Sequence, residues 1–327
     1  MSLTDGARAA VDWTLEATVV GSFSRIGYRA RRRLFGWDAE PPPDLTGRVV
    51  LVTGATSGLG LATAEALAAL GAEVWIVGRD RARTEDVRAS IGPKRVRTAL
   101  ADFARLDDVR ELAALVRGSS ARLDAVIHNA GALTHELQTT PDGLELTAQV
   151  HVVAPFLLTA ELLPLLRETA GSRVITVSSG GMYTQRLDVD ALASPPAPFN
   201  GVRAYANAKR AQVVLNERWS REEAARGVVF HAMHPGWADT PGVRSSLPRF
   251  RALMRPILRS PLEGADTMVW LAAGARPLET NGKLWLDRRT RLVAPIPGTH
   301  TDTATTERLW EWCVERAGAR PMIGAAR

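Results

Sequence analysis

The sequence predicts an α/β fold, a doubly wound parallel sheet with helices on both faces. Residues 48–80 read as strand, glycine turn, helix and strand, which is one βαβ unit. Both strands of this unit are continuous apolar runs, as is usual when a parallel strand is buried on both faces. The chain has 327 residues, 46% of them hydrophobic, so one large α/β domain with terminal extensions fits its length.

The βαβ unit is defined by the spacing of its apolar residues. Residues 49–52 and 74–77 are the two strands. The helix between them ends at Gly71 and has one apolar side, made of Leu61, Ala64, Leu67 and Ala68.

Three glycines lie between the first strand and the helix. Gly54, Gly58 and Gly60 have the spacing G-x-x-x-G-x-G. Glycine lets the backbone turn tightly and present N–H groups and a helix N-terminus to a pyrophosphate. Because a strand precedes and a helix follows these glycines, we predict a dinucleotide site, with a purely structural turn as the alternative.

The end of the second strand bears on which dinucleotide binds. An acidic residue there would hydrogen-bond the adenosine ribose and repel a 2′-phosphate, but the strand ends in Gly78 and Arg79. A guanidinium suits a phosphate. We therefore expect NADP(H) to be favoured over NAD(H). A carboxylate of Asp80 turned towards the ribose would reverse that preference.

A Tyr-x-x-x-Lys pair, Tyr205 and Lys209, occurs in a chain that has only three tyrosines. At this spacing both side chains project from one face of a helix. The Lys ammonium favours the tyrosinate and would lower the pKa of the phenol towards the range useful to a general acid or base. The alternative is an exposed Tyr beside a solvated Lys.

With the glycine turn and this pair in place, residues 45–287 resemble the short-chain dehydrogenase/reductase family. TGATSGLG resembles its cofactor loop, HNAG its Asn-Ala-Gly motif and MHPGWADTPG its Pro-Gly segment. VITVSSGGM, QVVLNERW and GADTMVWLA are similar to the retinol-dehydrogenase-like branch. The resemblance implies a seven-stranded parallel sheet of the Rossmann type and a nicotinamide dinucleotide cofactor.

The resemblance also assigns roles to residues. Ser179 would be the catalytic serine, Asn129 would steady the central sheet, and Asp102 would lie near the adenine. Pro235, Gly236 and Thr240 would lie by the nicotinamide. The whole cofactor-binding set, with Arg79 added from the argument above, is Gly54, Thr56, Ser57, Gly58, Leu59, Gly60, Arg79, Asp102, Asn129, Ala130, Gly131, Tyr205, Lys209, Pro235, Gly236 and Thr240.

These side chains suit hydride transfer between a nicotinamide and a carbonyl carbon. When the carbonyl is reduced, its oxygen gains negative charge and needs a proton. Tyr205 is the candidate acid or base, and Lys209 lowers its pKa and holds the nicotinamide ribose. Ser179 donates a hydrogen bond to the developing oxyanion; its alternative role is to satisfy a turn at the strand end.

His151, the fourth candidate catalytic residue, departs from the family pattern. It stands where family members commonly carry an active-site Asn, which holds a water that passes protons towards the Lys. A neutral imidazole can donate one hydrogen bond and accept another, whereas a protonated one would repel Lys209. Three hypotheses stay open: a working substitute, impaired or specialised catalysis, and a cofactor-binding protein with little turnover.

The segment between the candidate serine and tyrosine is longer than in compact family members. Prolines predict an ordered surface loop there, not a helix, at Pro195, Pro196 and Pro198. Loops at strand carboxyl ends line the ligand crevice of doubly wound sheets. We expect an apolar pocket mouth, suited to a lipid, retinoid, steroid or aromatic carbonyl, from Met182, Tyr183 and Phe199. Alternatively, these three side chains only hold the loop in place.

Residues 1–44 form an N-terminal segment. Apolar residues recur every three or four positions, interrupted by Gly21 and Gly27, and predict an amphipathic helix. Four arginines follow, and three prolines at 41–43 form a linker; the arginines are Arg29, Arg31, Arg32 and Arg33. The helix would pack on its own domain or a dimer mate, or contact a membrane surface through residues 8–34 with its arginines on anionic lipid. No signal peptide is expected.

Residues 45–290 would form the Rossmann domain and residues 291–327 a helical C-terminal extension. A late helix is expected at residues 261–274, the final strand at 282–287 and a last helix, with a Thr or Asp cap, within 301–318. The family resemblance leaves open a homodimer through the helices that flank the active site.

Composition narrows the partners. The single cysteine, Cys313, excludes an internal disulfide, and the six His lack metal-ligand spacing. We therefore expect no metal site and a cytoplasmic protein, peripheral to a membrane if the first segment docks there. The net charge of +6 comes mostly from dispersed arginines, so no nucleic-acid partner is expected.

The sequence thus predicts an NADP(H)-dependent oxidoreductase that interconverts a hydroxyl and a carbonyl group of an apolar substrate. The alternative is a dinucleotide-binding regulatory or scaffold protein of the same fold with weak or no turnover. Tyr205, Lys209 and Ser179 favour the enzyme, whereas His151 favours the alternative.

Overall fold

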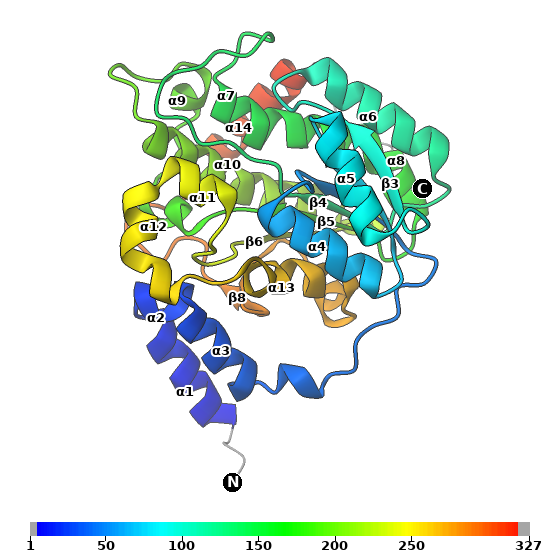
Figure 1. Ribbon diagram of the computed structural model, residues 1–327. Coiled ribbons are helices and arrows are strands. Elements are labelled where there is room, and N and C mark those ends of the chain that lie inside the picture. The colour runs from blue at the N-terminus through cyan, green and yellow to red at the C-terminus, as the bar shows by residue number, and fades with distance from the viewer. Residues whose placement is uncertain (1–4, 320–327) are drawn as a thin grey trace.

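The computed structural model describes residues 5–319, which fold around an eight-stranded sheet of order β3-β2-β1-β4-β5-β6-β7-β8 (Figure 1). The strands are Val49–Thr53 (β1), Glu73–Gly78 (β2), Val96–Leu100 (β3), Ala125–His128 (β4), Arg173–Val177 (β5), Val229–Met233 (β6), Lys283–Leu286 (β7) and Arg289–Arg291 (β8). Strands β1 to β7 pair in parallel, and β8 is antiparallel to β7. The predicted doubly wound α/β fold is confirmed.

The strand count differs from the predicted seven. The segment at residues 282–287 is a strand but not the final one, because the chain turns back at Asp287 and Arg288. Both residues have φ of 55°, and β8 then pairs with β7. Two left-handed residues make a tight hairpin turn whose twist matches the flanking strands. Asp is common at the first position of such a turn, but Arg288 stands where Gly is usual, so the turn carries little sequence signal.

Helices cover both faces of the sheet (Figure 1). One face carries α4 (Gly58–Ala69), α5 (Arg81–Ile91) and α13 (Pro261–Ala273). The other carries α6 (Leu106–Ser119), α8 (Ala154–Glu168) and α10 (Gly201–Glu222). Each layer closes one large apolar core against the buried strands, as the continuous apolar runs of β1 and β2 require.

The strand order reverses between β1 and β4, which places a crevice at the carboxyl ends of these two strands. The glycine turn follows β1, and Asn129 follows β4. The predicted βαβ unit is present as β1, α4 and β2. The sheet topology therefore brings the two motifs to one edge.

The N-terminal segment forms three short helices, not the one helix predicted: α1 (Asp5–Glu16), α2 (Val19–Phe23) and α3 (Arg25–Leu34). Ser24 ends α2 and begins α3, where its hydroxyl accepts a hydrogen bond from the backbone N–H of Ile26 at 3.3 Å. At the sharp bend that follows, a Cβ on Gly27 would lie 1.9 Å from the Gly21 carbonyl oxygen, so only glycine lets α2 and α3 approach so closely. In Figure 1 these helices lie below the yellow α11 (Pro241–Ser246) and α12 (Pro248–Met254).

Buried charges attach this segment to its own domain. Arg31 is fully buried and donates to Asp12 at 2.7 Å, to Asp287 at 2.8 Å and to Glu16 at 3.0 Å. The predicted basic run is therefore not a free cationic surface. Two of its other members are ion-paired, Arg29 with Glu263 and Arg32 with Asp38.

The C-terminal segment forms α14 (Thr303–Ala317), with the predicted cap supplied by Asp302. It packs on the outer side of α8 and α10. Trp310 contacts Trp219 of α10, with ring centroids 4.6 Å apart, and Phe156 of α8, at 5.1 Å. The late helix predicted at residues 261–274 is also confirmed, as α13.

The insertion before α10 contains a short helix, α9 (Val189–Ala193), so the prediction of a loop without a helix is wrong here. Asp188 caps α9 through a bond from the Ala191 N–H at 2.9 Å, and Leu192 is buried. The prolines all lie after α9, where they do not oppose it.

One stretch of the described residues, Leu146–Glu168, is long and apolar enough to cross a membrane. It comprises α7 (Leu146–Ala148), a π-helical turn at Gln149–Val153 and α8. Of its most apolar window, 83% is buried inside the fold. It is therefore explained as the core helix of the domain.

Candidate active site

The glycine turn is packed as tightly as a close backbone approach requires. Gly54 has φ of 64°, and a Cβ there would lie 2.9 Å from the Ala130 Cα. A Cβ on Gly60 would lie 2.4 Å from the Asn129 Nδ2. Asn129 itself donates to the carbonyl oxygens of Thr53 at 2.9 Å and Gly54 at 3.2 Å, which joins β1 to β4 beneath the turn. These residues form a cradle that fits a dinucleotide phosphate at the N-terminus of α4.

The remaining residues of the turn contact the segment that follows β6. Gly58 has φ of 57°, and a Cβ there would lie 3.4 Å from the Thr240 Cβ. Leu59 lies against Gly264 of α13. Ser57 has an extended backbone at the start of α4, and its side chain makes no capping bond. The structure thus brings the glycine turn and Thr240 together.

The end of β2 has an exposed Arg79, which makes no side-chain hydrogen bond or ion pair with the part of the chain that the structure describes. Asp80 is engaged as the cap of α5, accepting from the Arg83 N–H at 2.9 Å. The Thr56 methyl group lies against Gly78, where a Cβ would come within 2.6 Å of it. Asp102 follows the neighbouring strand β3, and its carboxylate accepts a hydrogen bond from the Ala104 N–H at 3.0 Å.

Tyr205, Lys209 and Ser179 meet at the carboxyl end of β5. Lys209 is buried, and its Nζ donates to the Val177 carbonyl oxygen at 2.7 Å and lies 5.5 Å from the centroid of the Tyr205 ring. The Ser179 hydroxyl accepts from the Gly181 N–H at 3.4 Å, and it is close enough to the Tyr205 phenol to favour the ionised phenol and lower its pKa. Ser179 therefore serves a turn and faces the phenol at once.

Burial changes the expected electrostatics of this pair. It lowers the pKa of Lys209 to about 7 and raises the pKa of Tyr205, while the hydrogen bond from Ser179 opposes that rise. The sequence predicted that Lys209 lowers the pKa of Tyr205, but burial of the phenol outweighs that effect in this fold. An ammonium that is half deprotonated near pH 7 exerts little field, and loss of hydration disfavours the tyrosinate.

His151 is buried in the π-helical turn, with its ring 5.3 Å from the Tyr205 ring. Burial and the nearby Lys209 hold the pKa of His151 well below its ordinary value, so the imidazole is neutral. Its Nε2 lies 2.8 Å from the Ala132 carbonyl oxygen, and its Nδ1 has no partner among residues 5–319. A Cβ on Gly131 would lie 2.5 Å from the imidazole Cε1, so glycine there makes room for the ring.

The comparisons with known proteins agree with this geometry. A model of the short chain dehydrogenase family matches residues 48–249. The chain belongs to the short-chain dehydrogenase/reductase family. It is 40% identical over 275 residues to human dehydrogenase/reductase SDR family member 12, covering 82% of this chain and 85% of that protein. It is 36% identical to mouse polyprenol dehydrogenase, covering 88% and 89% of the two chains.

Among solved structures, the Pseudomonas aeruginosa RhlG/NADP active-site complex has a TM-score of 0.62 at 26% identity, covering 75% of this chain and 96% of that one. The predicted retinol-dehydrogenase-like branch is confirmed, since retinol dehydrogenase 13 also matches. The chain is therefore an oxidoreductase that binds a nicotinamide dinucleotide and acts on hydroxyl or carbonyl groups.

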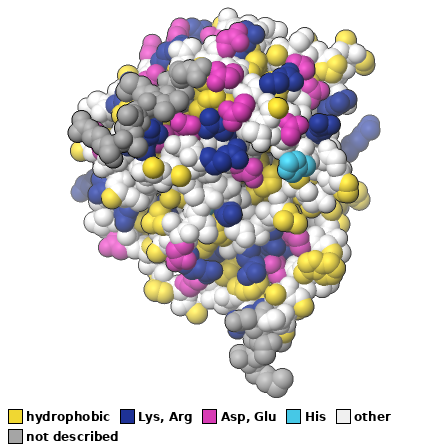
Figure 2. Space-filling view, turned by 180° about the vertical axis from the view of Figure 1, so that it is seen from behind, with side chains coloured by type: hydrophobic (Ala, Val, Ile, Leu, Met, Phe, Trp, Pro, Cys, Tyr) yellow, Lys and Arg dark blue, Asp and Glu magenta, His cyan; other side chains and the backbone are white. Residues whose placement is uncertain are grey.

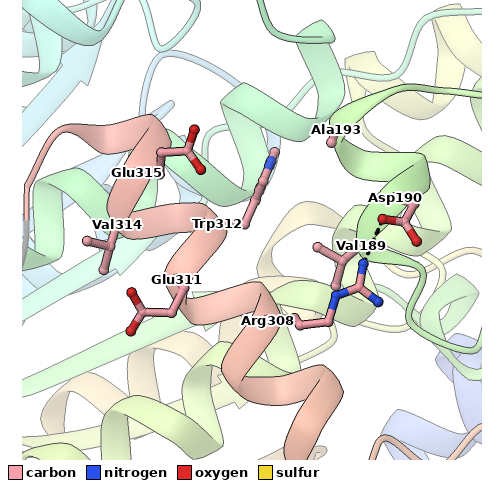
Figure 3. Close-up of a pocket in the computed structure, with 8 residues that line it drawn as sticks. All are labelled: Val189, Asp190, Ala193, Arg308, Glu311, Trp312, Val314 and Glu315. Atoms are coloured by element: carbon pink, nitrogen blue, oxygen red, sulfur yellow. Dashed lines mark hydrogen bonds and ion pairs between the residues drawn. The ribbon is translucent and has the colours of Figure 1, made fainter.

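Two surface cavities flank α9, and neither is lined by the catalytic side chains of this short-chain dehydrogenase/reductase. One, of about 550 Å³, lies between α9 and α14 and is crossed by the ion pair of Arg308 with Asp190 (Figure 3). The other, of about 600 Å³, is lined by Phe199 and by Ala204, the neighbour of Tyr205.

Sequence reasoning missed two groups that position the site. The Ser178 hydroxyl donates to the Lys209 carbonyl oxygen at 2.9 Å and joins β5 to α10. Arg259 donates to the Pro235 carbonyl oxygen at 3.2 Å. The paired serines at the end of β5 were a usable signal for the first group. The second had none, because its partners are distant in sequence. Among residues 5–319 no cluster of His, Cys, Asp and Glu has the form of a metal site.

Proposed function

We propose that the protein is an NADP(H)-dependent reductase and dehydrogenase that interconverts a carbonyl and a hydroxyl group of an apolar substrate. The observation that carries the proposal is the meeting of Ser179, Tyr205 and Lys209 beside the glycine turn. The bound cofactor would supply the hydride, and the residues of the chain would supply position and protons.

In the direction of reduction, Tyr205 is the proton donor. Burial raises the pKa of its phenol, which keeps the proton on the oxygen at neutral pH. Ser179 would donate to the carbonyl oxygen as negative charge develops there. Protonated Lys209 would stabilise the tyrosinate left after transfer, and this help is present below its pKa of about 7 and fades above it. Turnover in reduction should therefore fall as the pH rises through about 7.

NADP(H) is favoured over NAD(H) because the acidic residue beside the ribose position is already engaged. Asp80 caps α5, whereas the Arg79 guanidinium is exposed. A guanidinium binds a phosphate through paired hydrogen bonds. The NADP in the RhlG complex supports this choice.

An apolar substrate is supported by one relative, named polyprenol dehydrogenase. Phe199 lines a cavity that includes Ala204 but not Tyr205, and charged side chains share its wall. Met182 and Tyr183 do not add to that wall. They are buried in an apolar cluster with Phe23, so their main role is to hold the insertion in place.

The first experiment is a titration with NADPH and with NADH, followed by nicotinamide fluorescence excited through the nine tryptophans. Arg79→Ala should weaken NADPH binding about tenfold, the loss of roughly 1.4 kcal/mol, and leave NADH binding unchanged. Arg81→Ala, two residues further along at the start of α5, is the matched control. Equal NADPH affinity in wild type and Arg79→Ala would refute the NADP assignment.

Turnover is tested with NADPH and three probe carbonyls: retinaldehyde, farnesal and menadione. Tyr205→Phe should retain cofactor binding and lose activity by 10²-fold or more, on the order of general acid catalysis. A wild type that binds NADPH and reduces none of the probes would favour the scaffold alternative.

His151 is the observation that favours the scaffold alternative. The variant His151→Asn separates the three hypotheses. Turnover rises if the imidazole impairs catalysis, falls if the imidazole is a working substitute, and stays near zero in both proteins if cofactor binding is the function.

Peripheral membrane contact through residues 8–34 is a second part of the proposal. Exposed apolar side chains project from α1 to α3, at Val11, Trp13, Val19, Val20 and Ile26. Because Arg31 is buried and Arg29 and Arg32 are ion-paired, this contact would depend on apolar burial more than on anionic lipid. On the face of the molecule turned away from the viewer in Figure 1, acidic and basic side chains are interspersed (Figure 2).

The homodimer kept open by the family resemblance would need a face other than the one formed by α8 and α10. Helix α14 of the same chain already lies on these helices through Trp310. We infer a cytoplasmic protein that docks on membranes, and sedimentation equilibrium tests whether it is a monomer or a homodimer.

A further inference from the structure

Phe23, at the end of α2, brings the N-terminal helices against the catalytic edge of the sheet. Its ring is buried and contacts rings that follow two different strands. The centroid of the Phe23 ring lies 6.3 Å from that of Tyr183, which follows β5. It lies 4.6 Å from that of His234 and 5.9 Å from that of Trp237, which both follow β6. Phe23 therefore bridges two strand ends at which this enzyme family carries out its chemistry.

The contact with the first of these strand ends is unusually close. A Cβ on Gly180 would lie 2.6 Å from the Phe23 Cε2. Gly180 directly follows Ser179, and its φ is not positive, so glycine is required there by the phenyl ring and not by the backbone. The ring thus presses on the turn that aims the Ser179 hydroxyl at Tyr205.

The second strand end is held by the backbone of Phe23. Its carbonyl oxygen accepts from the Trp237 N–H at 2.8 Å and from the Arg259 Nε at 3.0 Å. Arg259 also donates to the Pro235 carbonyl oxygen and is paired with buried Asp287 at 2.6 Å. Gly236 has φ of 68°, and a Cβ there would lie 2.5 Å from the Phe23 oxygen.

We propose that Phe23 is a positioning residue of the active site, so that the N-terminal segment completes the catalytic edge. The ring fixes the turn of Ser179, and the carbonyl oxygen fixes the Pro235–Gly236 segment. The inference rests on the proposed oxidoreductase function. Substitution of the Phe23 side chain separates the effect of the ring from that of the carbonyl oxygen, because it removes the ring and keeps the oxygen.

A double-mutant cycle between Phe23 and Gly180 tests this contact. Gly180→Ala forces its methyl group against the ring, and the displaced Ser179 turn should lower kcat about 10²-fold, on the scale of a misplacement of about 1 Å. Phe23→Ala lets the turn relax and should lower kcat about tenfold. In the double variant the methyl group fills the vacated space, so kcat should be no lower than in Phe23→Ala alone.

The readouts distinguish positioning from folding. The kcat is measured with NADPH and whichever of the three probe carbonyls wild type reduces fastest, well below each variant's midpoint of thermal unfolding. The Kd for NADPH should change less than twofold, since the carbonyl oxygen remains. Trp37→Ala is the matched control: it removes a buried ring of the same segment that packs on Tyr28 and Arg288, and it should lose stability with kcat unchanged. Phe23→Leu repeats the cycle with a smaller loss of packing.

Each outcome decides one point. If the fold-changes in kcat of the two single variants simply multiply in the double variant, the positioning role is wrong. An unchanged kcat in Phe23→Ala and Phe23→Leu also overturns it. A wild type that binds neither NADPH nor NADH, or reduces no probe, overturns the proposed function and this inference with it. Coupling between Phe23 and Gly180 in kcat, with intact NADPH binding, supports both.

Discussion

The two terminal segments are attached to the same domain by different physical means. The N-terminal helices are held by buried ion pairs around Asp287, which receives hydrogen bonds from both Arg31 and Arg259. The C-terminal helix α14 is held by rings packed edge to face, with Trp310 against Trp219 and Phe156. The charged attachment lies at the catalytic edge of the sheet, whereas the aromatic attachment lies behind α8 and α10.

The difference has consequences for stability and for function. The rings of α14 pack on α8 and α10 in a way that is mostly independent of pH, and they touch no loop of the site, so they attach the helix without fixing loop geometry. Hydrogen-bonded charges are directional, costly to break and sensitive to protonation. Removing the N-terminal attachment should therefore affect both stability and catalysis, and removing the C-terminal one should affect stability alone.

The largest expected effect follows from Asp287→Ala. It leaves the buried guanidinium of Arg259 without a carboxylate and takes one of three carboxylates from Arg31, which should cost about 5 kcal/mol, near the upper end for breaking a buried pair. Urea unfolding gives the free energy, and the NADPH titration should show weaker binding because Arg259 loses its orientation. Asp190→Ala, in the exposed pair with Arg308, is the control and should cost about 0.5 kcal/mol or less. Similar losses in the two variants would show that burial of the cluster contributes nothing.

A somewhat smaller effect is expected from Trp310→Ala. Deleting this buried ring should cost about 3 to 4 kcal/mol of unfolding free energy. The Kd for NADPH and the kcat should stay at the wild-type values in protein that remains folded, because α14 touches only the outer side of the two helices. A clear loss of kcat at full folding would contradict the separation of the two attachments.

The third prediction concerns acid, and His234 carries it. Burial lowers the pKa of His234 to about 3, while the unfolded chain has the ordinary value near 6.5. The unfolded state therefore takes up the proton first, so the stability is complete above pH 6.5 and is lost as the pH falls towards 3. The groups that act on this imidazole are Arg259, Asp287, Arg291 and Arg31.

The measurement is the change in unfolding free energy between pH 7 and pH 5. For one such histidine the loss is about 2 kcal/mol at pH 5. His234→Gln should reduce the measured loss by about that amount. Hydrogen exchange at pH 5 should rise in α2 and α3 before it rises in α14, where the buried Cys313 thiol has a pKa well above its ordinary value and stays neutral. Equal exchange in both segments would contradict the assignment to the N-terminal attachment.

What the sequence predicted correctly was local. The β1, α4 and β2 unit follows from apolar spacing and from glycines that stand between a strand and a helix. The late helices carry their own caps, as Asp302 shows for α14. For the site, a Tyr and a Lys four residues apart on one helix are necessarily neighbours, which is why Tyr205 and Lys209 were identified.

What the sequence did not predict depends on distant partners. Arg31 has the sequence context of a solvated basic run, yet it is buried in the fold. Asp12 and Asp287 pair with its guanidinium there. The turn at Asp287 and Arg288 lacks the usual Gly at its second position, and the ion pairs of Asp287 stabilise its left-handed backbone instead. The lowered pKa of Lys209 follows from burial by the whole fold. Local spacing contains none of this information.

The smallest effect on stability, and the last distinction between the two segments, concerns their outer surfaces. The N-terminal helices expose Trp13, 73% of whose surface is accessible, whereas Trp310 and Trp312 of α14 are buried. Trp13→Ser should change the unfolding free energy by no more than about 0.5 kcal/mol, as is usual for exposed positions. It should weaken sedimentation with phosphatidylcholine vesicles, because Trp partitions strongly into the interface. Arg33→Ala tests the charge contribution separately. If sedimentation requires phosphatidylserine in the vesicles and is abolished by Arg33→Ala but not by Trp13→Ser, the apolar mode of docking is wrong and anionic lipid is the partner.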